Sequence, residues 1–298
     1  MGFYSKKAVL FSHGDCPDGA TSIVLARHIF TDLAWFPVEH KEIDRKALEE
    51  AGNLPPGSCF LMVDICVSRP VLDQIAAVLR TKECVIKIFE HHQSRLWLRD
   101  YCLSPGVTGE IIFDKAVCGS MLFFNKFNTE FPELRKYREL IELVNDRDLW
   151  LNQDERSALI YRLHKIYGDE GFINRFYENA AVTFTEKEKI LLDYQQQLDQ
   201  RQIDSLLKKL QISTDSNGFR MGYIYGEASS SELLNKAVRD FDLEYALLIN
   251  MNTGRVSARG RGNFDLAAFA ASFGGGGHKA ASAFYIKIKK PQITDTKG

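Results

Sequence analysis

Four short clusters of carboxylate and imidazole side chains follow apolar runs of the sequence, and they are the residues best suited to chemistry. They are residues 13–19 (HGDCPDG), Asp64, Glu90-His91-His92 and Asp146-Arg147-Asp148. Carboxylates and imidazoles that meet at one place can hold two divalent cations, and such a pair of ions promotes the hydrolysis of phosphoesters. The sequence therefore predicts a two-metal site for phosphoester chemistry.

The first cluster combines His13 with Asp15 and Asp18 on a short turn. Imidazole together with carboxylate suits Mn²⁺ better than Mg²⁺, which prefers oxygen ligands and retains its waters. Both aspartates could also be turn-forming side chains bonded to nearby backbone amides, since loops are rich in Asp and Gly. Asp64 alone is a weaker signal, because an aspartate after a strand often caps the next element.

The third cluster, Glu90-His91-His92, is a more specific signal than the first two. His91 and His92 are adjacent and directly follow an apolar run, and two imidazoles are costly to bury there without partners. A satisfied pair of core histidines is the alternative. Asp146 and Asp148 end a helical pattern, where the macrodipole disfavours carboxylates, and a cation or a basic neighbour would offset the cost.

A run of four glycines at 274–277, followed by His278, lies near the C-terminus, shortly after Arg259 and Arg261. Glycine backbone can approach a ligand closely and can offer N–H groups to an anion, and arginine binds phosphate through two hydrogen bonds. A substrate-binding role is therefore predicted for this group of residues: Arg259, Arg261, Gly275, Gly276, Gly277 and His278. A plain connection is the alternative for the glycines, and a solvated hairpin edge for Arg261.

Strand and helix patterns alternate through the first hundred residues. Continuous apolar runs predict strands at 8–12, 33–38, 59–63 and 84–89, and helical spacing predicts helices at 20–30 and 70–79. Such alternation favours a parallel sheet, whose ligands bind beyond the carboxyl ends of the strands. His13, Asp64 and His91 all fall at those ends.

The rest of the chain predicts a helical middle and a second, smaller α/β domain. Helices are expected at 118–127, 134–145, 158–167 and 171–177, and a long helix at 185–210 would join the domains or, alternatively, lie on the surface of one. The second domain would combine strands at 220–225, 245–249, 254–259 and 283–288 with helices at 231–238 and 266–273. The expected division is 1–185, a connecting helix 186–211, and 212–298.

Composition is that of an ordinary soluble globular protein, with 298 residues, 45% hydrophobic, 26% charged and a net charge of −1. That charge provides no general attraction for long nucleic acids. No apolar stretch reaches membrane-spanning length and the start lacks a signal-peptide core, so a cytoplasmic location is expected. The six cysteines show no zinc-binding spacing and are expected to be packed thiols. This includes Cys16, for which a ligand or redox role is the alternative.

Together, the four clusters resemble the four motifs of the DHH phosphoesterase family, with Glu90-His91-His92 at the name-giving triplet. Residues 274–281 (GGGGHKAA) resemble the glycine–histidine signature of the DHH-associated domain that follows in this family. Within this family, the sequence most resembles the nanoRNase or oligoribonuclease-like branch. The resemblance covers nearly the whole chain and makes 1–185 the catalytic domain and 212–298 the substrate-binding domain.

The resemblance implies two Mn²⁺ ions, with Mg²⁺ or Co²⁺ as possible substitutes. Their ligands would be His13, Asp15, Asp18, Asp64, His91 and either Asp146 or Asp148, with Asp148 favoured. Asp64 would bridge the ions and take part in catalysis, and His92 would contact the scissile phosphate. Arg259, the glycine run and His278 would hold the nucleotide.

Two positions depart from the family pattern. Glu90 replaces the usual aspartate of the triplet and is one methylene longer, so the surroundings of His91 could shift. Asp15 and Asp18 are separated by two residues where many members have one, so Asp15 could be displaced from the metal. Neither departure removes every ligand from an ion, and activity is expected to survive.

The predicted function is a Mn²⁺-dependent phosphodiesterase or phosphatase that hydrolyses short oligonucleotides or dinucleotides, such as nanoRNA or pApA, to mononucleotides. The alternatives are a polyphosphate or pyrophosphate hydrolase and a non-catalytic nucleotide sensor on the same fold. Short single-stranded RNA or DNA is the expected partner, and a homodimer is possible.

Overall fold

The computed structural model describes residues 6–228 and 230–288 of the chain. They form two compact units that divide between Gln195 and Gln196, within helix α7 (Glu186–Leu207). Each unit has a sheet and hydrophobic clusters of its own.

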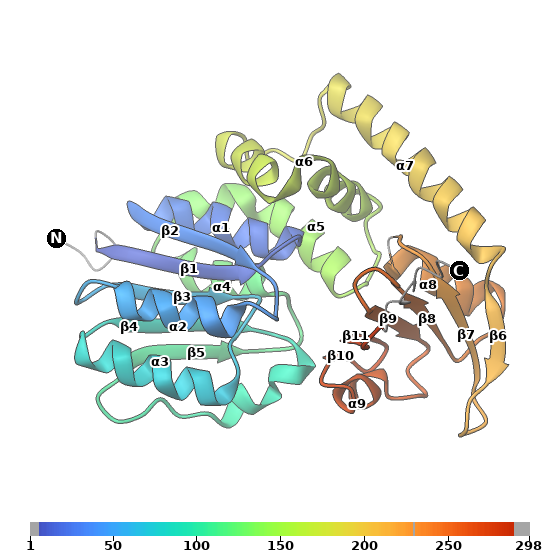
Figure 1. The fold of residues 1–298 in the computed structure, drawn as a ribbon. Helices are drawn as coiled ribbons and strands as arrows, with labels where there is room; N and C mark the ends of the chain where they lie inside the picture. Colours follow the sequence, from blue (N-terminus) through green and yellow to red (C-terminus); the bar gives the residue numbers. More distant parts are fainter. Residues whose placement is uncertain (1–5, 229, 289–298) are drawn as a thin grey trace, which may run out of the picture. The chain divides into compact units, whose positions relative to one another are not determined.

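The sheet of the first unit is parallel throughout, as the sequence predicts (Figure 1). Its order is β2 (Asp32–Val38), β1 (Lys7–His13), β3 (Cys59–Val63), β4 (Val85–Glu90) and β5 (Thr108–Phe113). Ser12 pairs with Val63, and Val63 pairs with Phe89. The residues that follow them, His13, Asp64 and Glu90, therefore lie level at the carboxyl edge of three adjacent strands.

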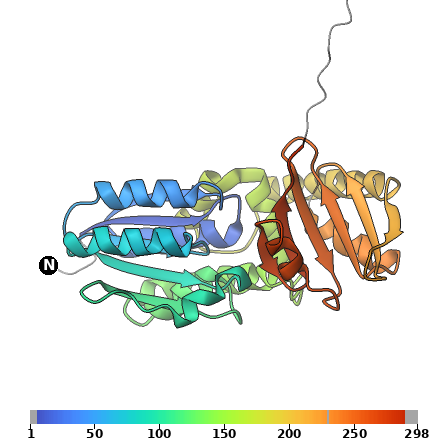
Figure 2. The ribbon, with the colours of Figure 1, turned by 60° about the horizontal axis from the view of Figure 1, so that its bottom comes forward.

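Helices cover both faces of this sheet (Figure 2). Helices α1 (Pro17–Ile29), α4 (Gly119–Phe127) and α5 (Arg138–Asp148) pack on one face, and α2 (Ile43–Asn53) and α3 (Arg69–Thr81) lie on the other. Side chains of β3 alternate between the two cores, because successive residues of a strand point to opposite faces. Leu61 belongs to the first core, whereas Phe60 and Met62 belong to the second.

Several elements differ from the sequence-based predictions. Strand β5 and helix α2 are not predicted; β5 is an edge strand without a long apolar run, and only three of the residues of α2 are buried. The helix expected at 134–145 consists of a 3₁₀ segment, η3 (Pro132–Tyr137), followed by α5. By contrast, the two helices expected at 158–167 and 171–177 are both present within α6 (Arg156–Glu178), where the non-helical Gly168, with a φ of 65°, separates two helical segments.

The second unit is built on a six-stranded mixed sheet. Its order is β10 (Gly276–His278), β11 (Ala281–Tyr285), β9 (Arg255–Gly260), β8 (Tyr245–Ile249), β7 (Arg220–Tyr225) and β6 (Gln211–Thr214). Only β7 and β8 pair in parallel among these described strands. Helix α8 (Ser230–Asp240) packs against β8 and β9, and the short α9 (Leu266–Ala271) precedes the glycine run.

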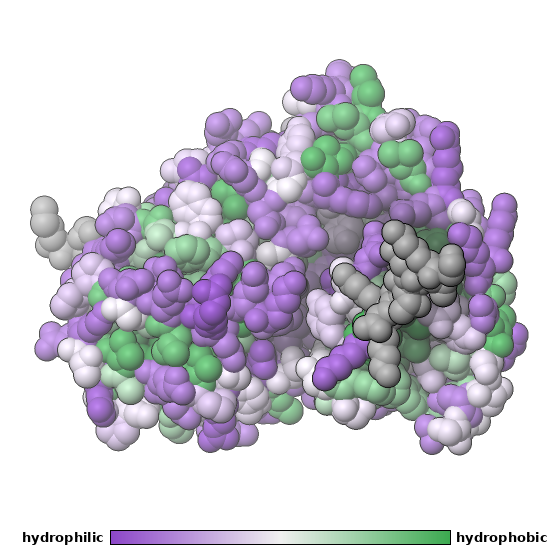
Figure 3. All heavy atoms as spheres, viewed as in Figure 1, coloured by the Kyte–Doolittle hydropathy of each residue, from purple (hydrophilic) through white to green (hydrophobic). Residues whose placement is uncertain are grey.

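Helix α7 exposes part of its apolar surface. Ile190 and Tyr194 are 69% and 60% exposed, and Figure 3 shows apolar surface along this helix. These side chains therefore contribute little to either hydrophobic core. In the part of the chain that the structure describes, no helix combines the length and apolar character needed to cross a membrane.

Candidate metal centre

Asp64 is the centre of the candidate site. It directly follows β3, has a φ of 62° and is 1% exposed, and its amide donates a hydrogen bond to the Phe89 carbonyl at 3.0 Å. A left-handed backbone is uncommon outside glycine, and such conformations concentrate at functional sites. A Cβ on Gly119 would come within 2.8 Å of the Asp64 side chain, so glycine there lets α4 begin directly against Asp64.

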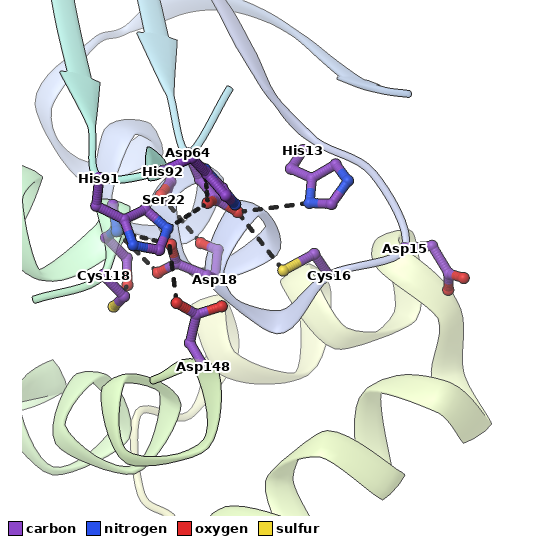
Figure 4. Close-up of polar contacts among 12 residues, drawn as sticks. His13, Asp15, Cys16, Asp18, Ser22, Asp64, His91, His92, Cys118 and Asp148 are labelled. Carbon is purple, nitrogen blue, oxygen red and sulfur yellow. Dashed lines mark hydrogen bonds and ion pairs between the residues drawn. The ribbon is translucent and has the colours of Figure 1, made fainter. Parts of the chain in front are cut away.

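Three overlapping groups of side chains bring their donor atoms together around Asp64. The groups are His13–Cys16–Asp64, Asp64–His91–His92 and Asp18–His91–Asp148, and within each group all donor atoms lie within 4.8 Å of one another. We refer to His13 and Cys16 as the His13 side, and to Asp18, His91 and Asp148 as the His91 side. Figure 4 shows both sides converging on the Asp64 carboxylate.

On the His91 side, Asp18 and His91 are buried, and the Asp148 side chain is 21% exposed. His91 Nε2 lies 3.0 Å from Asp64 Oδ1 and 3.5 Å from Asp148 Oδ2. Both oxygens of Asp18 accept hydrogen bonds from the first amides of α4, those of Gly119 (2.8 Å) and Ser120 (2.9 Å). These two bonds fix the position of the Asp18 side chain at the N-terminus of α4.

The His13 side is more open. His13 Nδ1 lies 3.8 Å from Asp64 Oδ2, and the Cys16 thiol donates to the same oxygen at 3.5 Å. The ring of His40 stacks obliquely on that of His13 at a centroid distance of 5.1 Å and lies 6.1 Å from that of His92. Sequence reasoning missed His40, although it follows the end of β2 by two residues and thus obeys the same strand-end rule as His13.

Glu90 organises the two histidines that follow it. Its Oε1 accepts hydrogen bonds from the His91 amide (2.9 Å), the His92 amide (3.0 Å) and His92 Nδ1 (2.7 Å). Burial opposes its ionisation, but the charge and hydrogen bonds of His92 outweigh burial and lower the pKa of Glu90. The bond between His92 Nδ1 and Glu90 fixes the orientation of the His92 ring.

The carboxylates of Asp64 and Asp148 have too little positive charge nearby to offset their burial. Burial, and then the neighbouring Asp18, raise the pKa of Asp64 well above its usual value. Burial also raises the pKa of Asp148, against the opposing effect of His91. Asp148 Oδ2 is buried and accepts no hydrogen bond among the described residues. Carboxylates crowded with imidazoles in this way fit divalent cations, which would supply the missing charge.

Asp15 lies apart from the three groups. Its side chain is exposed and points away from the cluster (Figure 4). Its amide donates to Asp169 Oδ2 at 3.1 Å, and Asp169 is itself held by His164 Nε2 at 2.7 Å. This anchor on α6 fixes the turn with Asp15 outward and Cys16 inward.

The two aspartates at the end of α5 have different surroundings. Asp148 belongs to the His91 side. The Asp146 carboxylate instead accepts hydrogen bonds from the amides of Gln153 (2.8 Å) and Asp154 (3.4 Å), in the loop after α5. The arrangement therefore gives Asp146 a loop-stabilising position and leaves Asp148 as the candidate ligand.

In the second unit, the two arginines differ in their contacts. Arg259 on β9 donates to Ser231 Oγ of α8 at 2.6 Å and is partly buried. Arg261 is exposed and forms an ion pair with Asp242, which is also exposed. An exposed pair of this kind contributes little to stability, so Arg261 remains on a solvated edge.

Part of the glycine run forms backbone hydrogen bonds within the second unit. The amides of Gly274 and Gly275 donate to carbonyls at the end of α9, and Gly276 to His278 form the edge strand β10. A Cβ on Gly275 or Gly277 would collide with the backbone of β11. Close strand packing thus accounts for these two glycines, and a ligand role for them stays a prediction together with those of Gly276 and His278.

No protein-family model matches the sequence, and no curated protein matches it either. Solved structures do resemble it. The DHH domain of a member of a family of ribosomal proteins has a TM-score of 0.61 at 14% identity, covering 94% of this chain and 82% of that one. An exopolyphosphatase-related protein from Bacteroides fragilis has a TM-score of 0.54 at 13% identity, covering 96% and 88%.

Two further structures are similar. A pGpG-specific phosphodiesterase from Vibrio cholerae has a TM-score of 0.53 at 12% identity, covering 95% of this chain and 94% of that one. RecJ from Thermus thermophilus, solved in complex with Mn²⁺, has a TM-score of 0.53 at 15% identity, and the match covers 94% of this chain but 50% of RecJ. These likenesses show that the chain has the fold of DHH-domain proteins.

Proposed function

We propose that the chain is a metal-dependent phosphodiester hydrolase that cleaves short oligonucleotides or dinucleotides to mononucleotides. The observation that carries the proposal is the convergence of three overlapping donor groups on the buried carboxylate of Asp64. Two bound divalent cations would supply positive charge to the phosphate and an activated water at neutral pH. The proposal assigns Mn²⁺ to the His91 side, where the donors are imidazole and carboxylate.

The side chains of the first unit have separate tasks in this proposal. Asp64 serves both sides, because its Oδ1 lies by His91 and its Oδ2 by His13 and Cys16. Glu90 holds the His92 ring through Nδ1, so that Nε2 can donate a hydrogen bond to a non-bridging phosphate oxygen. That bond grows stronger as negative charge develops during attack at phosphorus.

The second unit is proposed to bind the rest of the substrate. Arg259 is preorganised by its bond to Ser231 and is the preferred contact for a terminal phosphate, whereas Arg261 is already paired with Asp242. Few basic side chains are involved, and the net charge of the chain is −1. Both features favour a short substrate over a long polymer, which would need an extended basic track.

The names of the similar structures support a phosphoester substrate, and the proposal has two rivals. One is the phosphate polymer implied by the exopolyphosphatase-related protein, whereas the Vibrio phosphodiesterase supports the proposed dinucleotide. The second rival is a nucleotide sensor, which the comparisons do not suggest. A non-catalytic nucleotide sensor is disfavoured by the site itself. Glu90 bonds to the backbone and ring of the next two residues and leaves every donor of both sides in place.

The test is hydrolysis of 5′-labelled RNA from two to about twenty-four nucleotides, a span set around single-strand site sizes. The assay compares wild type with Asp64→Ala, in Mn²⁺, and includes inorganic polyphosphate. We expect mononucleotide release that weakens with length and is lost in the variant. Polyphosphate cleavage without RNA cleavage would replace the proposal with its rival, and nucleotide binding without any cleavage would establish a sensor.

A further inference from the structure

Cys16 occupies a position in the site where the sequence leads one to expect a carboxylate. It is the N-cap residue of α1, with extended backbone angles (φ −139°, ψ 127°), yet its side chain makes no capping hydrogen bond. Polar N-cap side chains usually bond to the first amides of the helix. The Cys16 thiol instead lies 3.5 Å from Asp64 Oδ2 and within 4.8 Å of the donor atoms of both His13 and Asp64.

The turn that carries Cys16 is fixed so that the thiol and not the Asp15 carboxylate faces the cluster. The Asp15 amide is bonded to Asp169 on α6, and the Asp15 side chain is exposed. Gly19 contributes on the other side, because a Cβ there would collide with the backbone of His13. The first turn of α1 is thereby packed against the end of β1, which keeps His13 and Cys16 together.

The distances suit a small ion with a sulfur ligand. Bond lengths typical of zinc give donor-to-donor distances of about 3.6 Å between sulfur and oxygen and about 3.4 Å between nitrogen and oxygen at a tetrahedral centre. The structure has 3.5 Å for Cys16 Sγ to Asp64 Oδ2 and 3.8 Å for His13 Nδ1 to the same carboxylate oxygen. The three donors need little rearrangement to share one ion.

We propose that Cys16 is a thiolate ligand that, with His13 and Asp64, selects a thiophilic divalent cation of the Zn²⁺ or Co²⁺ class on the His13 side. Sulfur donors favour such ions over Mn²⁺ and Mg²⁺. The His91 side has no sulfur among its donors and keeps its preference for harder ions. The inference rests on the proposed two-ion hydrolase and makes its two metal positions chemically unequal.

Cobalt titration of the full chain tests this proposal directly. A thiolate bound to Co²⁺ gives an intense charge-transfer absorption in the near ultraviolet, which imidazole and carboxylate ligands do not give. We expect this absorption in wild type and in Cys102→Ser, a matched control because Cys102 is exposed and lies outside the three groups. In Cys16→Ser it should vanish, with Co²⁺ affinity lowered by at least about tenfold. Its absence from wild type, or its survival in Cys16→Ser, would overturn the proposal.

A second measurement needs no variant and so does not depend on the folding of Cys16→Ser. Wild type is alkylated with and without saturating Zn²⁺, and the labelled peptides are quantified by mass spectrometry. We expect Zn²⁺ to slow alkylation of Cys16 by about tenfold or more and to leave Cys102 unchanged. Equal rates at Cys16 with and without bound Zn²⁺ contradict a sulfur ligand.

The same preparations separate this inference from the proposed hydrolase. A charge-transfer band that depends on Cys16, in a protein that cleaves no phosphoester, would leave the ligand in place and remove the hydrolase. Cleavage of short RNA by a protein whose Co²⁺ spectrum is unaffected by Cys16→Ser would retain the hydrolase and exclude the thiolate.

Discussion

The two sides of the Asp64 cluster are built differently. On the His91 side, Asp18 is held by two amides of α4 and His91 is fully buried. On the His13 side, the His13 side chain is 24% exposed and Cys16 is partly exposed. Asp148, at 21% exposed, is the most open member of the His91 side. In the proposed two-ion hydrolase, the side with the two buried donors would retain its ion more firmly, and the His13 side would admit substrate or exchange its ion more readily.

The largest effect is expected where the two sides meet. Asp64→Asn keeps the shape of the side chain but removes the charge that both sides share, so hydrolysis should fall on the order of 10²–10⁴-fold, the usual contribution of one group at a catalytic centre. Calorimetric titration should also show that binding is weakened on both sides. If metal binding were weakened on one side alone, Asp64 would not bridge two ions, and the two sides would be separate metal sites.

The same variant should stabilise the metal-free protein. The pKa of Asp64 is raised in the fold, so its contribution to stability is complete below the ordinary carboxyl range and is lost as pH rises through the raised value. In chelator at pH 7, the thermal unfolding temperature of Asp64→Asn should therefore be higher than that of wild type. This advantage should disappear toward pH ~4. With divalent cation added at pH 7, wild type should become more stable than Asp64→Asn. If Asp64→Asn stayed the more stable protein, metal binding at Asp64 would be contradicted.

A matched pair at the end of α5 tests the His91 side alone. Asp148→Asn removes a carboxylate that faces His91, and we expect metal affinity to fall about 10- to 100-fold, by analogy with supporting residues at metal sites. Asp146→Asn makes the same chemical change two residues earlier and should alter affinity less than about threefold, with a stability loss of at most ~1 kcal/mol from weaker loop bonds. Equal losses in both variants would show that charge near α5, not ligation, sets the affinity.

Much of the fold could be predicted because its strands are strongly marked. The run at 59–63 is fully buried and the run at 84–89 is mostly buried; they correspond closely to β3 and β4, and their carboxyl ends bring Asp64 and His91 together. Strand β5 has no comparable apolar run and could not be recognised by the same rule. The strand-end argument therefore predicted which residues lie together at the carboxyl edge, but it did not find the edge strand.

Which side chains face the Asp64 cluster depends on contacts in the folded chain that a local sequence pattern does not reveal. Asp15 and Cys16 are adjacent, and the side chain that faces the cluster is decided by Asp169, more than 150 residues away in the sequence. The role of Glu90 likewise follows from its bonds to the backbone of the next two residues, which keep the histidines in place despite the longer side chain. His40 could have been found from its position after β2.

The smallest effect is expected at Asp15, on the edge of the His13 side. Asp15→Asn preserves a residue that tolerates the observed φ of 52°, and it leaves the amide bond to Asp169 intact. Metal affinity and hydrolysis should therefore stay within about twofold of wild type.

Asp169→Asn is the informative companion, because it weakens the anchor and should let the turn move. Metal affinity should then fall more on the His13 side than on the His91 side. If Asp15→Asn were instead the more damaging variant, the Asp15 carboxylate would have to swing inward when an ion binds. The ion bound by Cys16 would then have the Asp15 carboxylate as a fourth ligand. The donor sets of the two sides would in that case differ less than the present structure indicates.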